Sequence, residues 1–144
     1  MNNVHFSSQS NEWETPQDFF NKLDKEFLFE LDVCATKENT KCNRWFEIQD
    51  DGLSKSWDNK NVWCNPPYGR EIGKWVKKAS ETRGGIVVML IPARTDTKYF
   101  HEYIYNKKNV EIRFIKGRLK FGGHQNSVPF PSMVVIFKDE NKTN

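Results

Sequence analysis

The tetrapeptide Asn65-Pro66-Pro67-Tyr68 has the residue types and the spacing to hold a planar amine. Proline fixes its own φ angle and carries no N–H, so the carbonyl groups of Asn65 and Pro66 are presented in a stiff, extended turn. The side chain of Asn65 adds a further carbonyl oxygen. Two rigid acceptors at the end of a strand suit a group with two protons to donate, such as the exocyclic amine of a nucleobase or a carboxamide. The ring of Tyr68 can lie against such a flat partner.

These contacts would also activate the amine. Accepting both of its N–H bonds draws the nitrogen toward a tetrahedral shape and localises its lone pair, so the nitrogen can attack before any base removes a proton. The alternative is a tight strand-to-helix loop with a packing tyrosine. The tetrapeptide directly follows an apolar segment and precedes an amphipathic helix, and this placement favours the functional interpretation.

The elements that position this turn alternate between helix and strand up to about residue 106, after which strands dominate. A first helix is predicted over residues 14–27, with Thr15 as the N-cap, Pro16 in the first turn, Asp18 at a capping-box position, and a buried stripe of Phe19, Phe20, Leu23 and Phe27. Further helices are predicted over residues 70–82 and 95–106. Strands are predicted within residues 27–35 (ending at Asp32), 44–48, 61–64, 84–93, 110–115, 118–121 and 132–137.

This order predicts an α/β fold with a three-layer sheet that is mostly parallel and has an antiparallel strand near its C-terminal end. In such sheets ligands bind beyond the carboxyl ends of the strands, near the point where the strand order reverses. Asp32 ends the first strong strand, and Asn65 follows the strand at 61–64. We therefore expect both side chains at the ligand-binding edge of the sheet.

The composition is that of one packed domain, because 37% of the 144 residues are hydrophobic and 14% are aromatic. We expect a flexible N-terminal arm (1–12), a single domain (13–138) and a polar tail (139–144). The three cysteines lack Cys-x-x-Cys spacing, which argues against a zinc site or a disulfide framework and favours a reducing cytosol. The net charge of +3 permits a polyanionic partner without requiring one.

Membrane insertion and export are not expected. No apolar run reaches the ~18 residues of a membrane-spanning helix, and the polar N-terminus has no hydrophobic leader. The cytoplasm is therefore the expected compartment.

Several motifs together resemble the small phage-type DNA N6-adenine methyltransferases, a Dam-like family. They are "EWETPQDFF", "LDVCATKENTKCNRWF", "DDGL", "VWCNPPYG", "MLIPARTDTKYFH", "GRLKFGG" and "PFPSMVVIF", spread over about residues 11–137. The Asn-Pro-Pro-Tyr tetrapeptide alone is shared with glutamine and ribosomal-RNA methyltransferases, whereas its combination with "PARTDT" and "GRLKFGG" is much more specific. The resemblance implies a compact, abridged Rossmann-like fold, S-adenosylmethionine as the cofactor, no metal, and site-specific methylation of adenine N6 in DNA.

The resemblance also implies roles for individual residues. Asn65, Pro66, Pro67 and Tyr68 would hold the target adenine, which such enzymes swing out of double-stranded DNA. Asp32 matches the acidic position of the cofactor-binding loop. The other positions expected at the cofactor are Trp13, Thr15 and Pro16 at its methionine end, Cys34 beside the site, and Asp50 or Asp51 on the adenosine side.

Contacts to DNA are expected from Arg94, Arg118, Lys120 and His124, with Arg94 the first choice for the phosphate backbone because it follows the apolar strand. The lysine pairs 77–78 and 107–108 are expected on solvated faces.

The cofactor loop departs from the pattern of related methyltransferases, which follow the first acidic residue with a glycine-rich turn. No glycine lies between Asp32 and Gly52, so the loop must be built differently. The segment between Asp32 and Asn65 is also short, which predicts an abridged sheet.

Two other functions stay open: the same fold acting on a protein glutamine or an RNA base, and a DNA-binding module that has lost cofactor affinity. The resemblance places the protein in a bacterial host cell, encoded by a phage or prophage.

Overall fold

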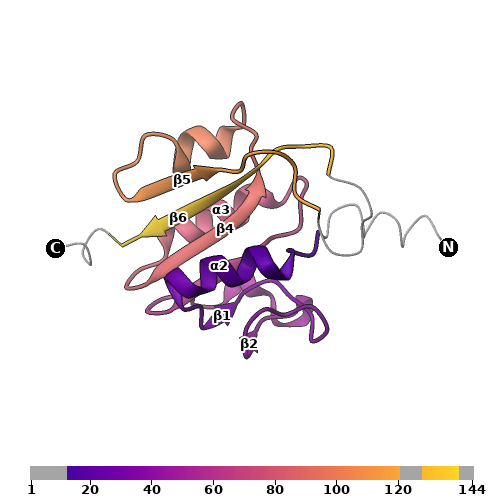
Figure 1. Cartoon of the computed structure of the whole chain (residues 1–144). Coiled ribbons are helices and arrows are strands. Elements are labelled where there is room, and N and C mark those ends of the chain that lie inside the picture. The colour runs from indigo at the N-terminus through magenta and orange to yellow at the C-terminus, as the bar shows by residue number, and fades with distance from the viewer. Residues whose placement is uncertain (1–12, 121–127, 140–144) are drawn as a thin grey trace.

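The structure is a computed structural model that describes residues 13–120 and 128–139 (Figure 1). Its described part is a single six-stranded sheet with helices on both faces. The predicted N-terminal arm, residue His124 and all but the first residue of the predicted tail lie outside the described residues.

The sheet has the strand order β2-β1-β3-β4-β6-β5. The pairs β1–β2, β1–β3 and β3–β4 are parallel, whereas β6 is antiparallel to both β4 and β5. This confirms the expected α/β class and the mostly parallel sheet with an antiparallel C-terminal strand. The strands are β1 (Leu31–Asp32), β2 (Arg44–Trp45), β3 (Asn61–Cys64), β4 (Ile86–Pro92), β5 (Val110–Phe114) and β6 (Ser132–Lys138).

The centre of the core is the long pairing of β4 with β6, in which Ile86 lies opposite Lys138 and Pro92 opposite Ser132. Six of the seven residues of each strand are buried, because both faces of the sheet are covered by helices. Continuous apolar runs such as Val87–Ile91 are the sequence signal of strands in this position.

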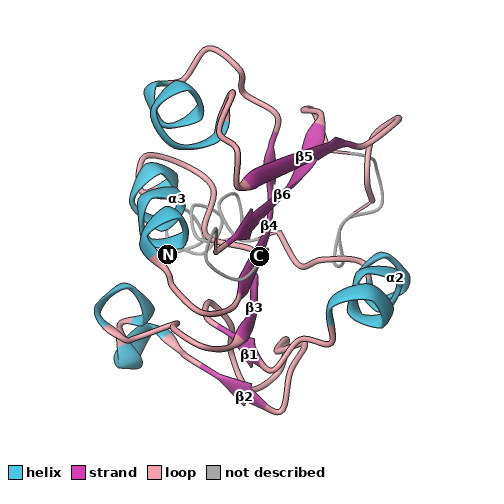
Figure 2. Ribbon diagram, turned by 90° about the vertical axis from the view of Figure 1, so that its left-hand side faces the viewer, coloured by secondary structure: helices cyan, strands magenta, loops and turns pink. Residues whose placement is uncertain are grey.

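The molecule has the three expected layers (Figure 2). Helix α2 (Gln17–Phe27) covers one face of the sheet, whereas helix α3 (Ile72–Glu81) lies on the opposite face. Each helix turns the predicted apolar stripe toward the sheet. The buried residues are Phe20, Leu23 and Phe27 in α2, with Phe19 partly buried, and Ile72, Trp75, Val76 and Ala79 in α3.

No α-helix separates β1, β2 and β3 in the chain. Two short 3₁₀ turns, η1 (Ile48–Asp50) and η2 (Gly52–Ser54), take up the connection from β2 to β3. The abridged sheet predicted from the short spacing between Asp32 and Asn65 is therefore observed, and each of β1 and β2 is only two residues long.

The predicted start of the first helix is wrong. Helix α2 begins at Gln17, its N-cap position is Pro16, and no side chain caps it. Thr15 does not cap the helix because its hydroxyl oxygen accepts a hydrogen bond from the side chain of Asn65. Asp18 completes no capping box; its carboxylate accepts from the backbone N–H of the next residue, Phe19.

Two predictions near the C-terminal half also need correction. The helix predicted over 95–106 contains a π-helical turn, η3 (Phe100–Ile104), in which the N–H of Tyr105 donates to the carbonyl of Phe100. In the described part of the predicted strand 118–121, residues 118–120 belong to no strand. The chain turns at Gly117, which has a φ of +79°, and the N–H of Val128 donates to the carbonyl of Leu119.

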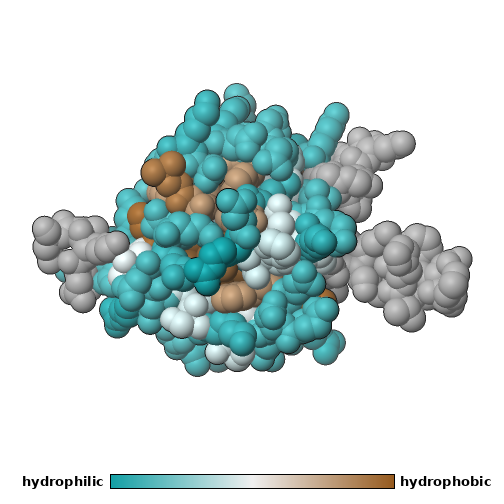
Figure 3. Space-filling model, turned by 90° about the horizontal axis from the view of Figure 1, so that it is seen from below, coloured by the Kyte–Doolittle hydropathy of each residue, from teal (hydrophilic) through white to brown (hydrophobic). Residues whose placement is uncertain are grey.

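Figure 3 shows hydrophilic residues over most of the face seen from below, with hydrophobic residues in small areas between them. In the described ranges, no helix has both the length and the apolar character needed to cross a bilayer.

Candidate functional site

A cavity of about 230 Å³ opens beyond the carboxyl ends of β1 and β3, which are neighbours in the sheet with Asp32 opposite Trp63. The strand order reverses here, because β2 lies on one side of β1 and β3 on the other. We call it the switch-point cavity, since ligands of open α/β sheets bind at this place. Its lining includes Trp13, Thr15, Asp32, Cys34, Lys41, Phe46, Glu47, Ile48, Asp51, Gly52, Trp63, Asn65, Pro66, Pro67 and Trp75.

The side chain of Asn65 is held in place through its amide nitrogen. Its Nδ2 donates to the backbone carbonyl of Trp13 and, at 3.0 Å, to Oγ1 of Thr15. A backbone carbonyl can only accept, so this pairing fixes which end of the amide is nitrogen. The opposite atom, Oδ1, is buried and has no hydrogen-bond partner among the described residues. Leaving such an acceptor unpaired costs about 1–3 kcal/mol, so Oδ1 is available to a ligand that donates an N–H.

The rest of the tetrapeptide leads from this cavity to a second one. Pro66 and Pro67 line the switch-point cavity, whereas Tyr68 lines a separate hollow of about 560 Å³, which we call the Tyr68 cavity. The Tyr68 cavity is also lined by Trp13, Gly69, Arg70, Ile72, Pro92, Arg94, Thr97, Tyr99, Pro129 and Phe130. Trp13 borders both cavities.

Three aromatic rings are fixed at the Tyr68 cavity. The hydroxyl of Tyr68 donates to the carbonyl of Leu90 at 3.0 Å, and burial raises the pKa of this phenol well above its usual range. The ring of Phe130 is edge-on to both Trp13 and Tyr68, with centroids 5.6 Å apart in each pair. Tyr68 is therefore a neutral wall of the cavity, anchored to β4 through its hydroxyl. Phe130 was not singled out from the sequence, because its segment "PFPS" shows only apolar and turn-forming residues.

Asp32 organises the loop that follows β1. Its Oδ1 accepts from the N–H of Cys34 at 3.3 Å, and its Oδ2 accepts from the N–H of Lys41 at 3.0 Å. Burial raises the pKa of this carboxyl to about 6, and the two backbone hydrogen bonds oppose that rise. The loop is thus closed by a carboxylate, in place of the glycine-rich turn that the resemblance led us to expect.

The close backbone approach that such glycines permit is supplied from another segment. A Cβ atom on Gly52 would lie 2.4 Å from the carbonyl oxygen of Val33 and 3.3 Å from the ring of Trp75. Gly52 therefore lets the 3₁₀ turn η2 lie directly on the loop after β1. The absence of glycine after Asp32 is compensated in space by a residue 20 positions later in the chain.

The two acidic candidates in "DDGL" have different surroundings. Asp51 lines the switch-point cavity, whereas Asp50 does not; its Oδ2 accepts from the N–H of Glu47 at 2.8 Å and closes η1. Glu47, which sequence reasoning missed, lines the cavity and accepts from Nε1 of Trp45. Its position just after β2 was the signal that could have found it, since an acidic residue after the second strand binds ribose in dinucleotide-binding folds.

The other predicted cofactor residues are also placed by the structure. Trp13, Thr15 and Cys34 line the switch-point cavity, but Pro16 does not. All three cysteines are free thiols. In the parts of the chain that the structure covers, no group of three or more His, Cys, Asp or Glu side chains could hold a metal ion. Lys41 lines the cavity and was missed, because nothing in the sequence distinguishes it from surface lysines.

Among the predicted DNA contacts that the structure describes, Arg94 lines the Tyr68 cavity. Arg94 is exposed, lines the cavity and has its guanidinium 6.0 Å from the ring centre of Phe130. Arg118 and Lys120 are exposed, and Arg118 donates weakly to the carbonyl of Val128 at 3.5 Å.

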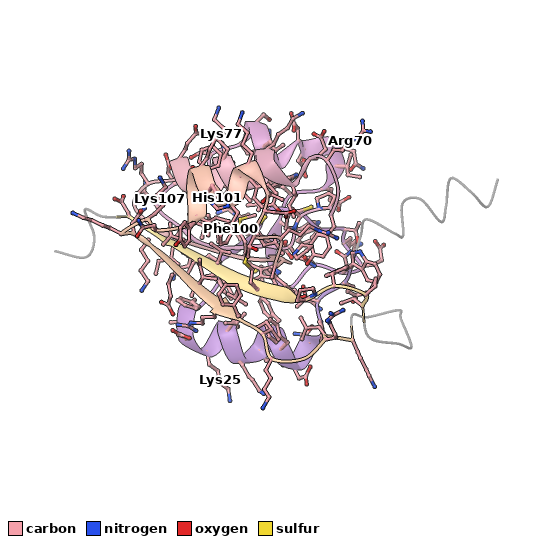
Figure 4. The ribbon with its side chains drawn as sticks, turned by 90° about the horizontal axis from the view of Figure 1, so that it is seen from above. Lys25, Arg70, Lys77, Phe100, His101 and Lys107 are labelled. Atoms are coloured by element: carbon pink, nitrogen blue, oxygen red, sulfur yellow. The ribbon has the colours of Figure 1, made fainter. Side chains whose placement is uncertain are left out.

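The lysine pairs are mostly solvated, as expected. Lys77 is exposed, and Figure 4 shows it on the outside of the helix layer. Both members of the 107–108 pair are exposed as well. Lys78 is the exception, because it is partly buried and its ammonium lies 5.8 Å from the ring centre of Trp57.

The fold and the site define an α/β protein with a cavity at the switch point of a mixed sheet and an Asn-Pro-Pro-Tyr turn that borders two cavities. Residues 4–143 match the family described as DNA N-6-adenine-methyltransferase (Dam). The chain belongs to this family, which confirms the resemblance inferred from its motifs.

Two phage proteins are similar to the chain. The DNA N-6-adenine-methyltransferase of Haemophilus phage HP1 is 29% identical over 136 residues, which cover 88% of this chain and 78% of the phage protein. The DNA N-6-adenine-methyltransferase of Escherichia phage T1 is 33% identical over 102 residues, covering 68% of this chain and 42% of the phage protein. The alignment therefore spans less than half of the T1 protein.

Proposed function

We propose that this chain transfers a methyl group from S-adenosylmethionine to the exocyclic N6 amine of adenine in DNA. The observation that carries the proposal is the buried, unpaired Oδ1 of Asn65 at the switch-point cavity. An adenine amine has two N–H bonds to donate, and this oxygen together with the Pro66 carbonyl supplies two acceptors. Membership of the DNA N-6-adenine-methyltransferase family supports the same reaction.

The switch-point cavity fits the cofactor in the chemistry of its lining. It offers aromatic surfaces for an adenine ring, and it contains the acidic residues Asp32, Glu47 and Asp51. S-adenosylmethionine, when bound, supplies an electrophilic methyl group on a positively charged sulfur. Glu47 and Asp51 would accept from ribose hydroxyls, in keeping with acidic residues that follow the second strand of nucleotide-binding sheets. Trp13, Thr15 and Cys34 would border the methionine end.

The Tyr68 cavity would receive the target base after it leaves the DNA stack. Tyr68 and Phe130 present aromatic surface there, and Asn65 is three residues before Tyr68 at the junction with the switch-point cavity. The acceptors at Asn65 and Pro66 would hold the amine so that its lone pair forms the new N–C bond as the C–S bond breaks. The extra proton leaves the nitrogen afterwards, so no basic side chain is required at the moment of attack.

The architecture supports a compact, abridged Rossmann-like methyltransferase, with residues 13–138 as its one domain. The supporting features are the parallel strands β2-β1-β3-β4, the switch point beside β1, and the helices on both faces. The two phage relatives support a phage-encoded protein that acts in the cytoplasm of a bacterial host.

The test is transfer of labelled methyl from S-adenosylmethionine to duplex DNA, to RNA and to bacterial protein in parallel reactions. We expect label in DNA only, recovered as N6-methyldeoxyadenosine after digestion to nucleosides. Label in RNA or on protein glutamine would overturn the acceptor and leave the cofactor assignment standing. Absence of heat in a calorimetric titration with S-adenosylmethionine would favour a DNA-binding module without catalytic function.

A further inference from the structure

The switch-point cavity has one cationic side chain among its described lining residues, that of Lys41. Lys41 ends the loop after β1, where its backbone N–H donates to Asp32. Its side chain is only 8% exposed, which is unusual because lysine is almost never buried without a partner. The contacts of this largely covered side chain therefore show what else its ammonium could bind.

The partners of this ammonium in the structure are few. Nζ donates to the amide oxygen of Gln17 at 2.9 Å, and the Glu14 carboxylate lies 4.0 Å away with its own side chain 48% exposed. The Asp32 carboxylate also attracts the lysine charge, but its two oxygens already accept backbone N–H groups. An ammonium has three protons to donate, so Lys41 can bind a further anionic acceptor.

The position of Lys41 identifies the end of the cavity at which that anion would lie. Gln17 and Glu14 flank Thr15, whose hydroxyl is bonded to Asn65. Lys41 is therefore at the end of the cavity nearest the Asn-Pro-Pro-Tyr turn, whereas the predicted ribose-binding acids, Glu47 and Asp51, belong to the segment after β2.

The lining offers charged groups of both signs, as the cofactor does. S-adenosylmethionine carries two positive groups, the sulfonium and the α-ammonium, and one negative group, the α-carboxylate. The lining carries three carboxyl groups and a single ammonium. We propose that Lys41 binds the α-carboxylate of the cofactor and thereby selects for an intact amino-acid end, an inference that rests on the proposed function.

The test compares S-adenosylmethionine with decarboxylated S-adenosylmethionine, which lacks only the carboxylate. Calorimetry gives the ratio of the two dissociation constants for each protein variant, without any need for turnover. In the wild type we expect S-adenosylmethionine to bind at least about tenfold more tightly, because a hydrogen bond to a charged group contributes about that factor or more. In Lys41→Met the ratio should fall to near one, chiefly through weaker binding of S-adenosylmethionine.

Matched variants separate carboxylate binding from a role in folding. Lys37→Met removes an exposed lysine of the same loop and should keep the wild-type ratio, and Lys41→Arg should keep most of it. Lys41→Gln replaces Lys41→Met if the latter does not fold.

Three outcomes would overturn the inference: no preference in the wild type, an unchanged ratio when Lys41 loses its charge, or equal loss of affinity for both compounds. The last would show that Lys41 only ties the loop to α2. If the wild type binds neither compound, the proposed function fails as well, so the two failures are distinguishable.

Discussion

The nitrogen and the oxygen of the Asn65 side-chain amide have different roles. Its nitrogen ties β3 to the segment before α2, through Trp13 and Thr15, and its oxygen remains free for a ligand. The same contacts explain why Thr15 is 3% exposed and does not cap the helix. The tetrapeptide could be predicted as a site from residue types alone. The pairing that orients Asn65 could not, because it joins residues about 50 positions apart.

Replacing Asn65 by alanine should abolish methyl transfer. We expect kcat to fall at least about a hundredfold, because a hydrogen bond that strengthens as the reaction proceeds contributes on that scale. Cofactor affinity should also fall, since Asn65 lines the switch-point cavity and holds Trp13 and Thr15 in place. Filter-binding of labelled DNA product and calorimetry with S-adenosylhomocysteine measure the two effects. Near-wild-type turnover would mean that another group aims the amine.

Two substitutions of Tyr68 should separate the role of its ring from the role of its hydroxyl. Tyr68→Ala should abolish transfer but retain cofactor binding better than Asn65→Ala, because Tyr68 does not line the switch-point cavity. Tyr68→Phe should keep transfer within a few-fold and lower the free energy of unfolding by about 1 kcal/mol, through loss of the hydrogen bond to Leu90. Urea unfolding and steady-state kinetics test both statements. A Tyr68→Phe variant as inactive as Tyr68→Ala would assign the chemistry to the hydroxyl.

Asp32 makes the protein sensitive to pH. Its pKa is raised from 3.8 to about 6 by burial, so folding favours the protonated carboxyl. This contribution to stability is fully present below about pH 4 and is lost as the pH rises through about 6. A cationic cofactor favours the ionised form, so its affinity should rise across the same range.

Titrations with S-adenosylmethionine between pH 5 and 7.5 should show this rise in the wild type. Asp32→Asn, which cannot ionise, should bind more weakly at pH 7.5 and should show a much flatter profile. An identical pH profile in both proteins would assign the ionisation to another group.

At the scale of elements, the spacing of apolar residues and the length of apolar runs predicted most of the architecture. The buried runs that became β4 and β6 and the stripes of α2 and α3 are present where the sequence predicts them. One error has a long-range cause, because the hydroxyl of Thr15 accepts a hydrogen bond from Asn65 and does not cap α2. Another has a local cause. Residues 118–120 alternate like a strand, yet Gly117 turns the chain away from the sheet.

At the scale of elements, Gly52 is the residue whose substitution should have the clearest effect on stability. In Gly52→Ala, a methyl group would meet the Val33 carbonyl at 2.4 Å, so η2 must move away from the loop after β1. We expect a loss of about 1–3 kcal/mol in the free energy of unfolding, the usual range for overpacking, together with weaker cofactor binding. Thermal unfolding with and without S-adenosylhomocysteine measures both. Lys55→Ala, at the exposed position directly after the same turn, is the control, and equal effects of the two substitutions would contradict this account.

At the scale of the whole molecule, binding to DNA should depend on salt through the exposed basic residues near the Tyr68 cavity. Arg94→Ala should weaken binding across DNA sequences and should reduce the slope of log affinity against log salt by about one, the effect expected for one lost phosphate contact. Lys77→Ala, on the outside of α3, is the control and should leave the slope unchanged. Fluorescence anisotropy over a salt series gives the slopes. A response to salt that is flat in the wild type would argue against phosphate contacts as the source of affinity.

Because Trp13 lines both cavities, a movement of this residue would alter the shape of both. Energetic coupling is reciprocal, so whatever factor bound DNA applies to the affinity for the cofactor, the cofactor applies to the affinity for DNA. Release of the used cofactor and of the methylated duplex would then be coupled through this one residue.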